Sequence, residues 1–354
     1  MNLFKAIAYS AAKREHILLL LLLVVVSGAF VHHDTLWRWD NLIYDTQLSL
    51  WARDVSDDIV IIAVDDESLN QLGRWPWSRA IHADLINKID FESPRVIGLD
   101  IIFSEPDSSD HLSDVALSEA IKSSGKVVLP LFMTTKSNNS VPIEALPLPE
   151  FTNNTAALGH VHIDVSDDGV ARKVYLKEGI GEPQWLHYSL ALLSVVNGSS
   201  NHSLDLTSEN ENVQYSPLRW AREHPYLIPF AGPSGHFLQI GYAQVLAGQY
   251  EKNLFHDKIV LVGTTAEGLG DALPTPLSGS SGAMPGVEII ANVVDAINND
   301  IYINEIEKSW QIIITVLLVL LPLVIYPRLN PAHALWVLFS VIALTVVLVG
   351  LLLL

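Results

Sequence analysis

Two long apolar stretches, one near each end of the chain, limit what this sequence can fold into. Residues 17–31 are almost wholly aliphatic, and residues 312–354 are apolar apart from a short break at 326–333. A helix needs about 20 apolar residues to cross the hydrocarbon core of a bilayer. The residues between the two stretches have normal polarity and are numerous enough for one large or two small hydrophobic cores. The sequence therefore predicts a water-soluble body with membrane anchors at both ends.

The composition narrows the classes of partner and site. Only 17% of the 354 residues are charged, whereas about 25% is typical of soluble proteins. The formal net charge of −18 argues against nucleic acid and against an anionic membrane surface as partners. Because the chain has no cysteine, a disulfide scaffold, a thiolate metal site and a cysteine nucleophile are excluded.

Basic residues near the apolar stretches predict how the chain crosses the membrane. Lys5, Lys13 and Arg14 precede the first stretch, and Arg328 lies in the break of the second. Positively charged residues favour the cytoplasmic side of a membrane. We therefore expect, in order, a cytoplasmic N-terminus (1–16), a first membrane helix (17–33), an extracytoplasmic domain (34–309), a second membrane helix (310–326), a cytoplasmic loop (327–333) and a third membrane helix (334–354).

A cleaved signal peptide is the alternative interpretation of residues 17–31. It is less favoured because no A-x-A site follows and because Trp37 and Trp39 suit a membrane interface. Helical spacing of apolar residues predicts a juxtamembrane helix over 35–52 that continues the first membrane helix. This helix either packs at the base of the domain or transmits movement to the membrane helix. Because the sequence stops inside the third apolar stretch, we expect a further membrane helix and a cytoplasmic part in the full-length protein.

The residues from 57 to 132 predict the fold class of the body. Ile59–Val64 and Arg95–Ile102 are short apolar runs that suit buried strands, and a helical pattern capped by Ser78 separates them. A second helical pattern at 111–124 leads to a third strand at 126–132. Strands that alternate with helices in this way form a parallel sheet with right-handed crossovers. We therefore predict an α/β domain with a largely parallel central sheet, plus one transmembrane helix before it and at least two after it.

The rest of the body gives shorter patterns. Residues 134–154 are polar and rich in proline, which predicts a surface loop. A hairpin is expected where 158–163 and 170–176 flank an Asp-Asp-Gly turn. Further along we expect a helix at 184–196, a short strand at 227–230, a brief helix at 240–247, a strand at 258–262 and a helix at 286–299.

Acidic and hydroxyl side chains follow several of the predicted strands. In a parallel sheet the carboxyl ends of the strands share one edge, which is the usual place for a ligand crevice. The candidate ligand-binding residues are Asp65, Asp66, Trp75, Arg79, Asp100, Glu105, Thr264, Thr265 and Asp271. Oxygen ligands suit Mg²⁺ or Ca²⁺, or a cationic or hydroxylated small molecule. We assign no catalytic residue, no metal ligand and no cofactor from the sequence.

Each candidate also has a purely structural interpretation. Asp65, Asp66 and Asp271 are in positions where a carboxylate commonly caps the next helix. Trp75, Trp77 and Arg79 fit a buried aromatic corner with an arginine stacked on it. Two weaker metal hints are a pair of histidines, His160 and His162, and a group of carboxylates at Asp164, Asp167 and Asp168 that also suits a turn.

Motifs of known catalytic chemistry are absent from the sequence. The chain has no G-x-S-x-G elbow, no H-E-x-x-H, no Walker loop and no G-x-G-x-x-G. Two functional interpretations of the acidic crevice and the body stay open at this point. One is an extracytoplasmic hydrolase that uses the acidic crevice and a metal, and the other is an envelope scaffold that recruits a partner protein.

Seven segments of the chain, in order, resemble the type-two CHASE domain. They are DIVIIAVDDESL, LGRWPWSRAIHADL, PRVIGLDIIFSEPD, DGVARKVYL, IPFAG, DKIVLVGTTAEGLGD and MPGVEIIANVVDAI, and YDTQLSLWAR at 44–53 also resembles the family's opening helix. The resemblance covers about residues 40–304. No binding residue is transferred from it.

The resemblance implies an extracytoplasmic sensor of a bacterial transmembrane receptor, a multi-pass protein of the inner membrane with its sensor in the periplasm. In such receptors a cyclase or kinase output domain, including two-component kinases, follows in the cytoplasm. That domain is absent from this chain, so the sensor region is not expected to be an enzyme. By analogy we also expect a homodimer in contact with membrane lipid, and an unknown small-molecule or envelope ligand.

Overall fold

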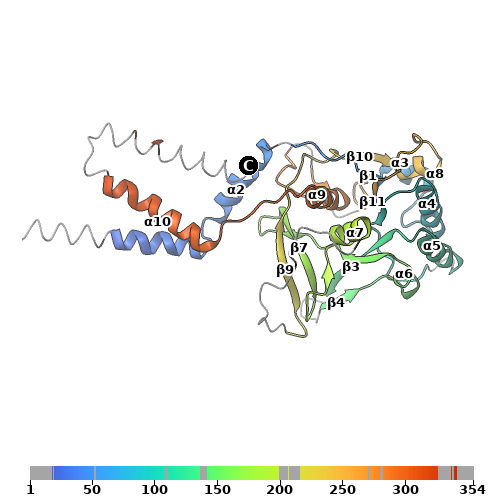
Figure 1. The fold of residues 1–354 in the computed structure, drawn as a ribbon, viewed down its shortest axis with the longest axis horizontal. Coiled ribbons are helices and arrows are strands. Elements are labelled where there is room, and N and C mark those ends of the chain that lie inside the picture. The colour runs from blue at the N-terminus through green and yellow to red at the C-terminus, as the bar shows by residue number, and fades with distance from the viewer. Residues whose placement is uncertain are drawn as a thin grey trace, which may run out of the picture. The chain divides into compact units, whose positions relative to one another are not determined.

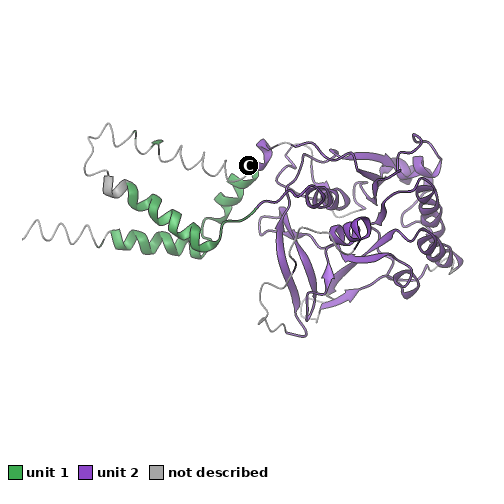
Figure 2. Ribbon diagram, in the orientation of Figure 1, with its two compact units in different colours: residues 1–47, 304–354 green, residues 48–303 purple. Residues whose placement is uncertain are grey.

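The computed structural model describes residues 18, 20–51, 53–107, 111–135, 142–198, 206, 216–269, 272–279, 282–325, 336 and 339–340. Figure 2 shows its two compact units. One comprises residues 48–303, and the other comprises residues 1–47 together with 304–354. The larger unit holds nearly all of the buried core and is described first.

A seven-stranded sheet forms the centre of the larger unit. Its strands run in the order β10-β1-β11-β2-β3-β4, and β5 also pairs with β3. The bounds are β1 Ile59–Val64, β2 Val96–Leu99, β3 Val127–Thr135, β4 Pro142–Ala145, β5 Ala157–His160, β10 Leu238–Gly241 and β11 Ile259–Thr264. Every pairing is parallel except that of β3 with β4. The predicted α/β fold with a largely parallel sheet is therefore confirmed.

Helices cover both faces of this sheet (Figure 1). On one face α4 (Arg79–Phe91) and α5 (His111–Ser124) pack against alternate strand residues, among them Val60 and Ile62. Ser78 caps α4, as predicted, by accepting a hydrogen bond from the Ala80 amide. On the other face lie α7 (Tyr188–Asn197) and α9 (Gly286–Asn298). Because successive side chains of a strand point to opposite faces of the sheet, the buried strand residues contribute to two cores, one on each face.

Glycines in the strands let α7 and α9 approach the sheet closely. A Cβ atom on Gly159 of β5 would lie 2.6 Å from the Cα atom of Tyr188 in α7. A Cβ atom on Gly263 of β11 would lie 2.6 Å from the Cβ atom of Val287 in α9. Both distances are shorter than real contacts of this kind. The spacing between the sheet and these helices therefore requires residues without side chains.

A four-stranded antiparallel sheet forms the other part of the same unit. It comprises β6 (Asp164–Val165), β7 (Ala171–Ile180), β8 (Trp185–Leu186) and β9 (Trp220–Leu227). The predicted turn exists, since Gly169 has a φ of 81° and Ser166 pairs with Val170 across it. The strand before the turn is β6, however, because residues 157–160 pair with β3 in the central sheet instead. The hairpin prediction for 158–163 was therefore wrong.

Other segments also differ from the sequence prediction. The proposed loop at 134–154 contains β4, an edge strand, and α6 (Pro149–Thr152), which begins at a proline. The brief helix at 240–247 divides into β10 and α8 (Tyr242–Leu246). Pairing with β7 places β9 at 220–227 rather than 227–230. In each case contacts with distant segments decide the structure, and the local sequence pattern does not reveal those contacts.

A short two-stranded ladder and one further helix complete the unit. β12 (Ala272–Leu273) pairs with β13 (Met284–Pro285), directly before α9. The helix α3 (Asp66–Leu72) follows β1 and was not among the predicted helices. It is only seven residues long and has few apolar positions, so its helical period is weak.

The smaller unit contains the segments expected to cross the membrane. Its elements include a helix at Leu20–His32, most of α2 (Trp37–Leu50) and α10 (Lys308–Ile325). Within the unit the Lys308 ammonium lies 2.7 Å from the Asp34 carboxylate.

Among the described residues, no single helix combines the length and the apolar character needed to cross a membrane. The helices Leu20–His32 and Trp37–Leu50 reach that length together, but they are bent by 65° relative to each other. The juxtamembrane helix therefore follows the preceding helix after a bend and is not collinear with it. The expected cytoplasmic N-terminus at 1–16 lies outside the described residues, as do the loop at 327–333 and almost all of the third predicted span at 334–354.

Candidate functional site

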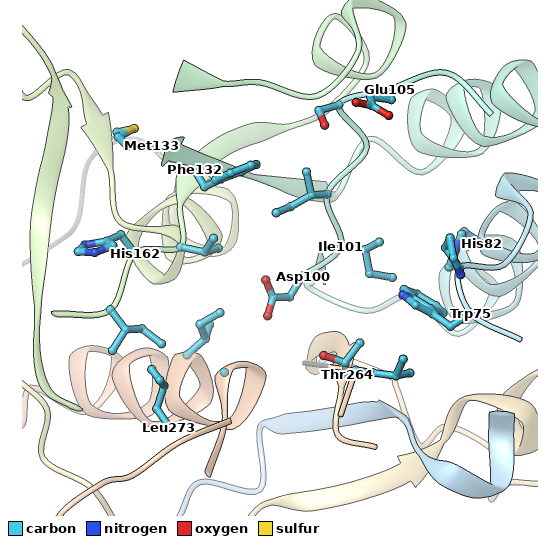
Figure 3. Close-up of a pocket in the computed structure, with 18 of the residues that line it drawn as sticks. Trp75, His82, Asp100, Ile101, Glu105, Phe132, Met133, His162, Thr264 and Leu273 are labelled. Carbon is cyan, nitrogen blue, oxygen red and sulfur yellow. The ribbon is translucent and has the colours of Figure 1, made fainter. Parts of the chain in front are cut away.

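A cavity of about 740 Å³ lies at the carboxyl ends of the parallel strands. Asp100 follows β2, Thr264 ends β11, and Phe132 belongs to β3. His162 comes two residues after β5. Figure 3 shows that the Asp100 carboxylate is directed into the open space between these walls. The cavity is at the edge of the sheet where the sequence predicts a ligand crevice.

Four other elements close the cavity. Trp75 and Arg79 come from the loop before α4 and from its first residue. Gly286 and Ile290 come from the first turn of α9 and the residue after it. Val165 of β6 and Leu273 of β12 complete the opposite side. The pocket therefore lies between the parallel sheet and the antiparallel sheet of one compact unit.

The structure divides the nine candidate residues into two groups. Those that line the cavity are Trp75, Arg79, Asp100, Glu105 and Thr264. Asp65 instead caps α3, since its Oδ1 atom accepts a hydrogen bond of 2.8 Å from the Ser68 amide, and Asp66 is the first residue of that helix. Thr265 donates its amide to the Val64 carbonyl at 3.1 Å. Asp271 lies outside the described residues.

An aromatic corner forms the wall of the cavity next to α4. The ring centroids of Trp75 and Trp77 are 5.0 Å apart, and the Trp77 indole donates to the Gly73 carbonyl at 2.9 Å. The His82 Nδ1 atom lies 2.8 Å from the Tyr242 hydroxyl. Burial, together with the Arg79 charge, lowers the pKa of His82 to about 3. His82 is therefore neutral at physiological pH.

Arg79 stacks on a different ring from the one expected. Its guanidinium lies 4.9 Å from the Phe103 ring centroid, so it does not stack on the tryptophans. Its Nη2 atom donates to the Glu105 carbonyl at 3.2 Å, and its Nε atom is 3.7 Å from the Asp114 carboxylate. The aromatic corner exists as predicted, but Phe103 is its arginine-stacking member. Arg79 is held by these contacts at the rim of the cavity.

A buried carboxylate that the sequence analysis did not select lies beside the cavity. Glu178 of β7 is fully buried. Its oxygens accept a hydrogen bond of 3.0 Å from the Trp220 indole and lie 3.3 Å from Arg222 Nε and 3.1 Å from His162 Nδ1. A single glutamate in an alternating strand is typical of an exposed position, so no local signal could identify it. Glu178 fixes His162, which is one wall of the cavity.

The two weak metal hints have structural explanations. His160 is fully buried, and its ring centroid lies 5.1 Å from that of His187. Burial is the main cause that lowers the pKa of both histidines, and the charge of His162 adds to it. Asp168 forms an ion pair of 2.9 Å with Arg172, and Asp164 pairs with Arg222 at 3.2 Å. Among the described residues no group of three histidine, aspartate or glutamate side chains could hold a metal ion.

Three buried polar side chains of α9 hold neighbouring segments. The Glu288 carboxylate accepts from the Gly235 amide at 2.7 Å and from the His236 amide at 3.0 Å. The Asn292 Oδ1 atom accepts from the Ala231 amide at 2.9 Å. Both side chains are buried, and no sequence pattern singled them out.

The last of the three polar side chains binds the segment that enters the domain. Asp295 forms a buried ion pair with Arg53 and accepts a hydrogen bond of 3.1 Å from the Ser56 amide. Arg53 Nη2 also donates to the Pro229 carbonyl at 3.0 Å. The helix that begins at the cavity is thus bonded, near its other end, to the residues that follow α2.

The family model of the CHASE2 domain matches residues 17–325, which is most of the chain. The chain belongs to the CHASE2 family. CHASE2 is an extracytoplasmic sensory domain rather than a catalytic one, in agreement with the resemblance noted in the sequence. Neither the curated proteins nor the solved structures contain a match to this CHASE2 chain.

Proposed function

We propose that this chain is the signal-input module of a bacterial transmembrane receptor. A small molecule binds in the cavity of the periplasmic CHASE2 domain, and the membrane helices carry the signal to a cytoplasmic cyclase or kinase. The observation that supports this most directly is the position of α9. Its first residues line the cavity, and Asp295 near its other end is bonded to Arg53.

α9 is suited to transmit a displacement because it is rigidly packed. Every residue from Val287 to Ile297 is buried. Close-packed interiors move as units and switch between discrete arrangements rather than deforming continuously. A ligand that displaces Gly286 or Ile290 therefore displaces the Asp295 end as well. The chain continues from α9 to α10 through residues 299–307, so both segments that leave the domain are joined to this helix.

The ligand acts through a difference in affinity. A ligand shifts a two-state equilibrium only to the extent that it binds one state better than the other. In the proposed mechanism the cavity is wider in one position of α9 than in the other. Filling the cavity with a larger side chain should then mimic or block the ligand.

Because the chain has no cysteine, any disulfide between copies in a cross-linking test must join the introduced cysteines. Single cysteines are placed at successive positions from 37 to 47 of α2, in membranes that contain the full chain. In a homodimer a periodic subset should form disulfides between copies. Thr264→Trp, which fills the cavity, should change which positions cross-link, whereas Thr265→Trp, whose position does not line the cavity, should not. An unchanged pattern in both variants would remove transmission from the proposal, and no cross-link at any position would remove the dimer.

The proposed location needs its own test. A cysteine replacing Glu182, which is exposed in the turn between β7 and β8, should react with a membrane-impermeant maleimide in intact spheroplasts. A cysteine replacing Lys13 should react only after lysis. The opposite labelling pattern would place the domain in the cytosol and would refute the receptor proposal.

A further inference from the structure

We infer that the cavity binds an organic cation, with an ammonium group at Asp100 and an apolar body against the surrounding walls. This inference rests on the proposed function of the cavity as the ligand site. It specifies the chemical class of the ligand, which neither the fold nor the family provides.

The charge of the residues that line the cavity favours a cationic ligand. Among the described lining residues Arg79 is the only arginine or lysine, whereas two, Asp100 and Glu105, are acidic. The Arg79 charge is already opposed by Asp114, which is outside the lining, and its guanidinium is stacked on Phe103. His82 is neutral, and His162 is held by the Glu178 carboxylate. The lining is therefore negative on balance, and a partly enclosed negative site attracts cations and repels anions.

The apolar side chains in the walls of the cavity favour an organic ligand over a metal ion. Trp75, Ile101, Phe132, Met133 and Leu273 surround the space into which the Asp100 carboxylate points (Figure 3). A cavity of about 740 Å³ whose walls combine apolar side chains with polar groups is typical of sites for organic ligands. Trp75 also offers the ring type that binds cations best. A hydrated metal ion would make no favourable contacts with these apolar side chains.

The N-terminus of α9 is the feature that would favour an anion instead. Gly286, the first residue of this helix, lines the cavity, and the positive end of a helix dipole attracts negative charge. However, Glu288 lies in the same first turn and is fully buried, so a carboxylate of the chain already opposes that end of the dipole. The balance of charge still favours a cation.

The test compares probes that differ in charge. Binding to the purified full chain is measured by calorimetry with choline, with its neutral isostere 3,3-dimethylbutan-1-ol, with benzyltrimethylammonium and with 3-phenylpropionate. Benzyltrimethylammonium should bind most tightly, because it adds an aromatic ring to the ammonium group, and choline should bind more tightly than the neutral alcohol. Asp100→Asn should weaken binding of both cations by about tenfold or more, because the ionic partner is lost. Asp66→Asn removes an exposed carboxylate elsewhere and should have no effect.

Several outcomes would overturn the inference. They are tighter binding of 3-phenylpropionate than of the cations, equal binding of choline and its neutral isostere, unchanged affinity in Asp100→Asn, or no binding of either cation. The proposed function fails on different grounds, since it requires that Thr264→Trp alter the α2 cross-links whatever the ligand is. A correctly folded Asp100→Asn variant is verified by an unchanged midpoint of thermal unfolding.

Discussion

Arg53 and Asp295, which are 242 positions apart in the chain, form an ion pair in the interior of the larger unit. The Asp295 side chain is 0% exposed and that of Arg53 is 11% exposed. This pair joins the segment after α2 to the helix that lines the cavity. Its loss should affect both the stability of the domain and the proposed transmission.

Asp295→Asn should destabilise the domain by about 3 kcal/mol, because it leaves the Arg53 guanidinium buried without its counter-charge. The free energy of unfolding is measured by urea titration with tryptophan fluorescence. Lys126→Gln is the matched control, since Lys126 pairs with Asp90 at 4.0 Å and both side chains are about a third exposed, so its loss should cost under about 1 kcal/mol. Equal losses in the two variants would contradict the role given to the buried pair.

Gly159→Ala should destabilise the domain by about 1–3 kcal/mol, because the added methyl group would collide with the backbone of α7. The thermal midpoint should fall correspondingly. Gly28→Ala is the control, because no atom lies within 4 Å of the position of its added Cβ. If Gly159→Ala were as stable as Gly28→Ala, the close approach of α7 to β5 would be wrong.

Acid should weaken the domain through its buried histidines. Burial lowers the pKa of His82 and of His187 from 6.5 to about 3 in the folded state. Below pH 6.5 the unfolded chain binds protons at these sites and the folded chain does not, so stability is present above pH 6.5 and falls as the pH falls toward 3. Each histidine should contribute a loss of about 2 kcal/mol between pH 6.5 and pH 5.

The histidine contribution is measured as the slope of unfolding free energy against pH. His82→Gln should flatten that slope between pH 6.5 and pH 5, even if the variant is less stable at neutral pH. Gln71→Ala changes an exposed side chain that does not titrate, so it should leave the slope as in the wild type. A slope that is the same in all three proteins would show that His82 titrates alike in the folded and unfolded states.

Glu178→Gln should destabilise the domain by about 2 kcal/mol, because a buried carboxylate that contacts Arg222, His162 and Trp220 would lose its charge. Trp220, whose indole donates to Glu178, should change its fluorescence in the folded state. Glu182→Gln, an exposed change nearby, should do neither. Indistinguishable unfolding curves for the two variants would mean that the Glu178 cluster contributes nothing to stability.

The parts of the fold with the clearest local sequence patterns could be predicted from the sequence. β1 is an uninterrupted apolar run, β11 begins with the apolar run 259–262, and α5 has the predicted bounds. Their alternation with helices was sufficient to give the parallel sheet, and the sheet gave the edge at which Asp100 and Thr264 meet. Here the local pattern and the tertiary structure agree.

The remaining features depend on contacts between distant residues. The sequence around Asp65 fits a ligand-binding residue and a helix cap equally well. Only the hydrogen bond from the Ser68 amide in the short helix α3 identifies Asp65 as a cap. Glu288, Asn292 and Asp295 recur along one side of α9, which is the pattern of a solvent-facing stripe. They are buried because residues 53–56 and 229–236 cover them, and no local property of the helix records that cover.

The polar side chains of α9 bond mainly to peptide groups. Glu288, Asn292 and Asp295 accept from the amides of Gly235, His236, Ala231 and Ser56. Every amino acid except proline supplies such an amide, so the covering segments can diverge in sequence without losing these bonds. In distant members of the family, the three helix positions and Arg53, which pairs with Asp295 through its side chain, should therefore persist while the other residues of the covering segments drift.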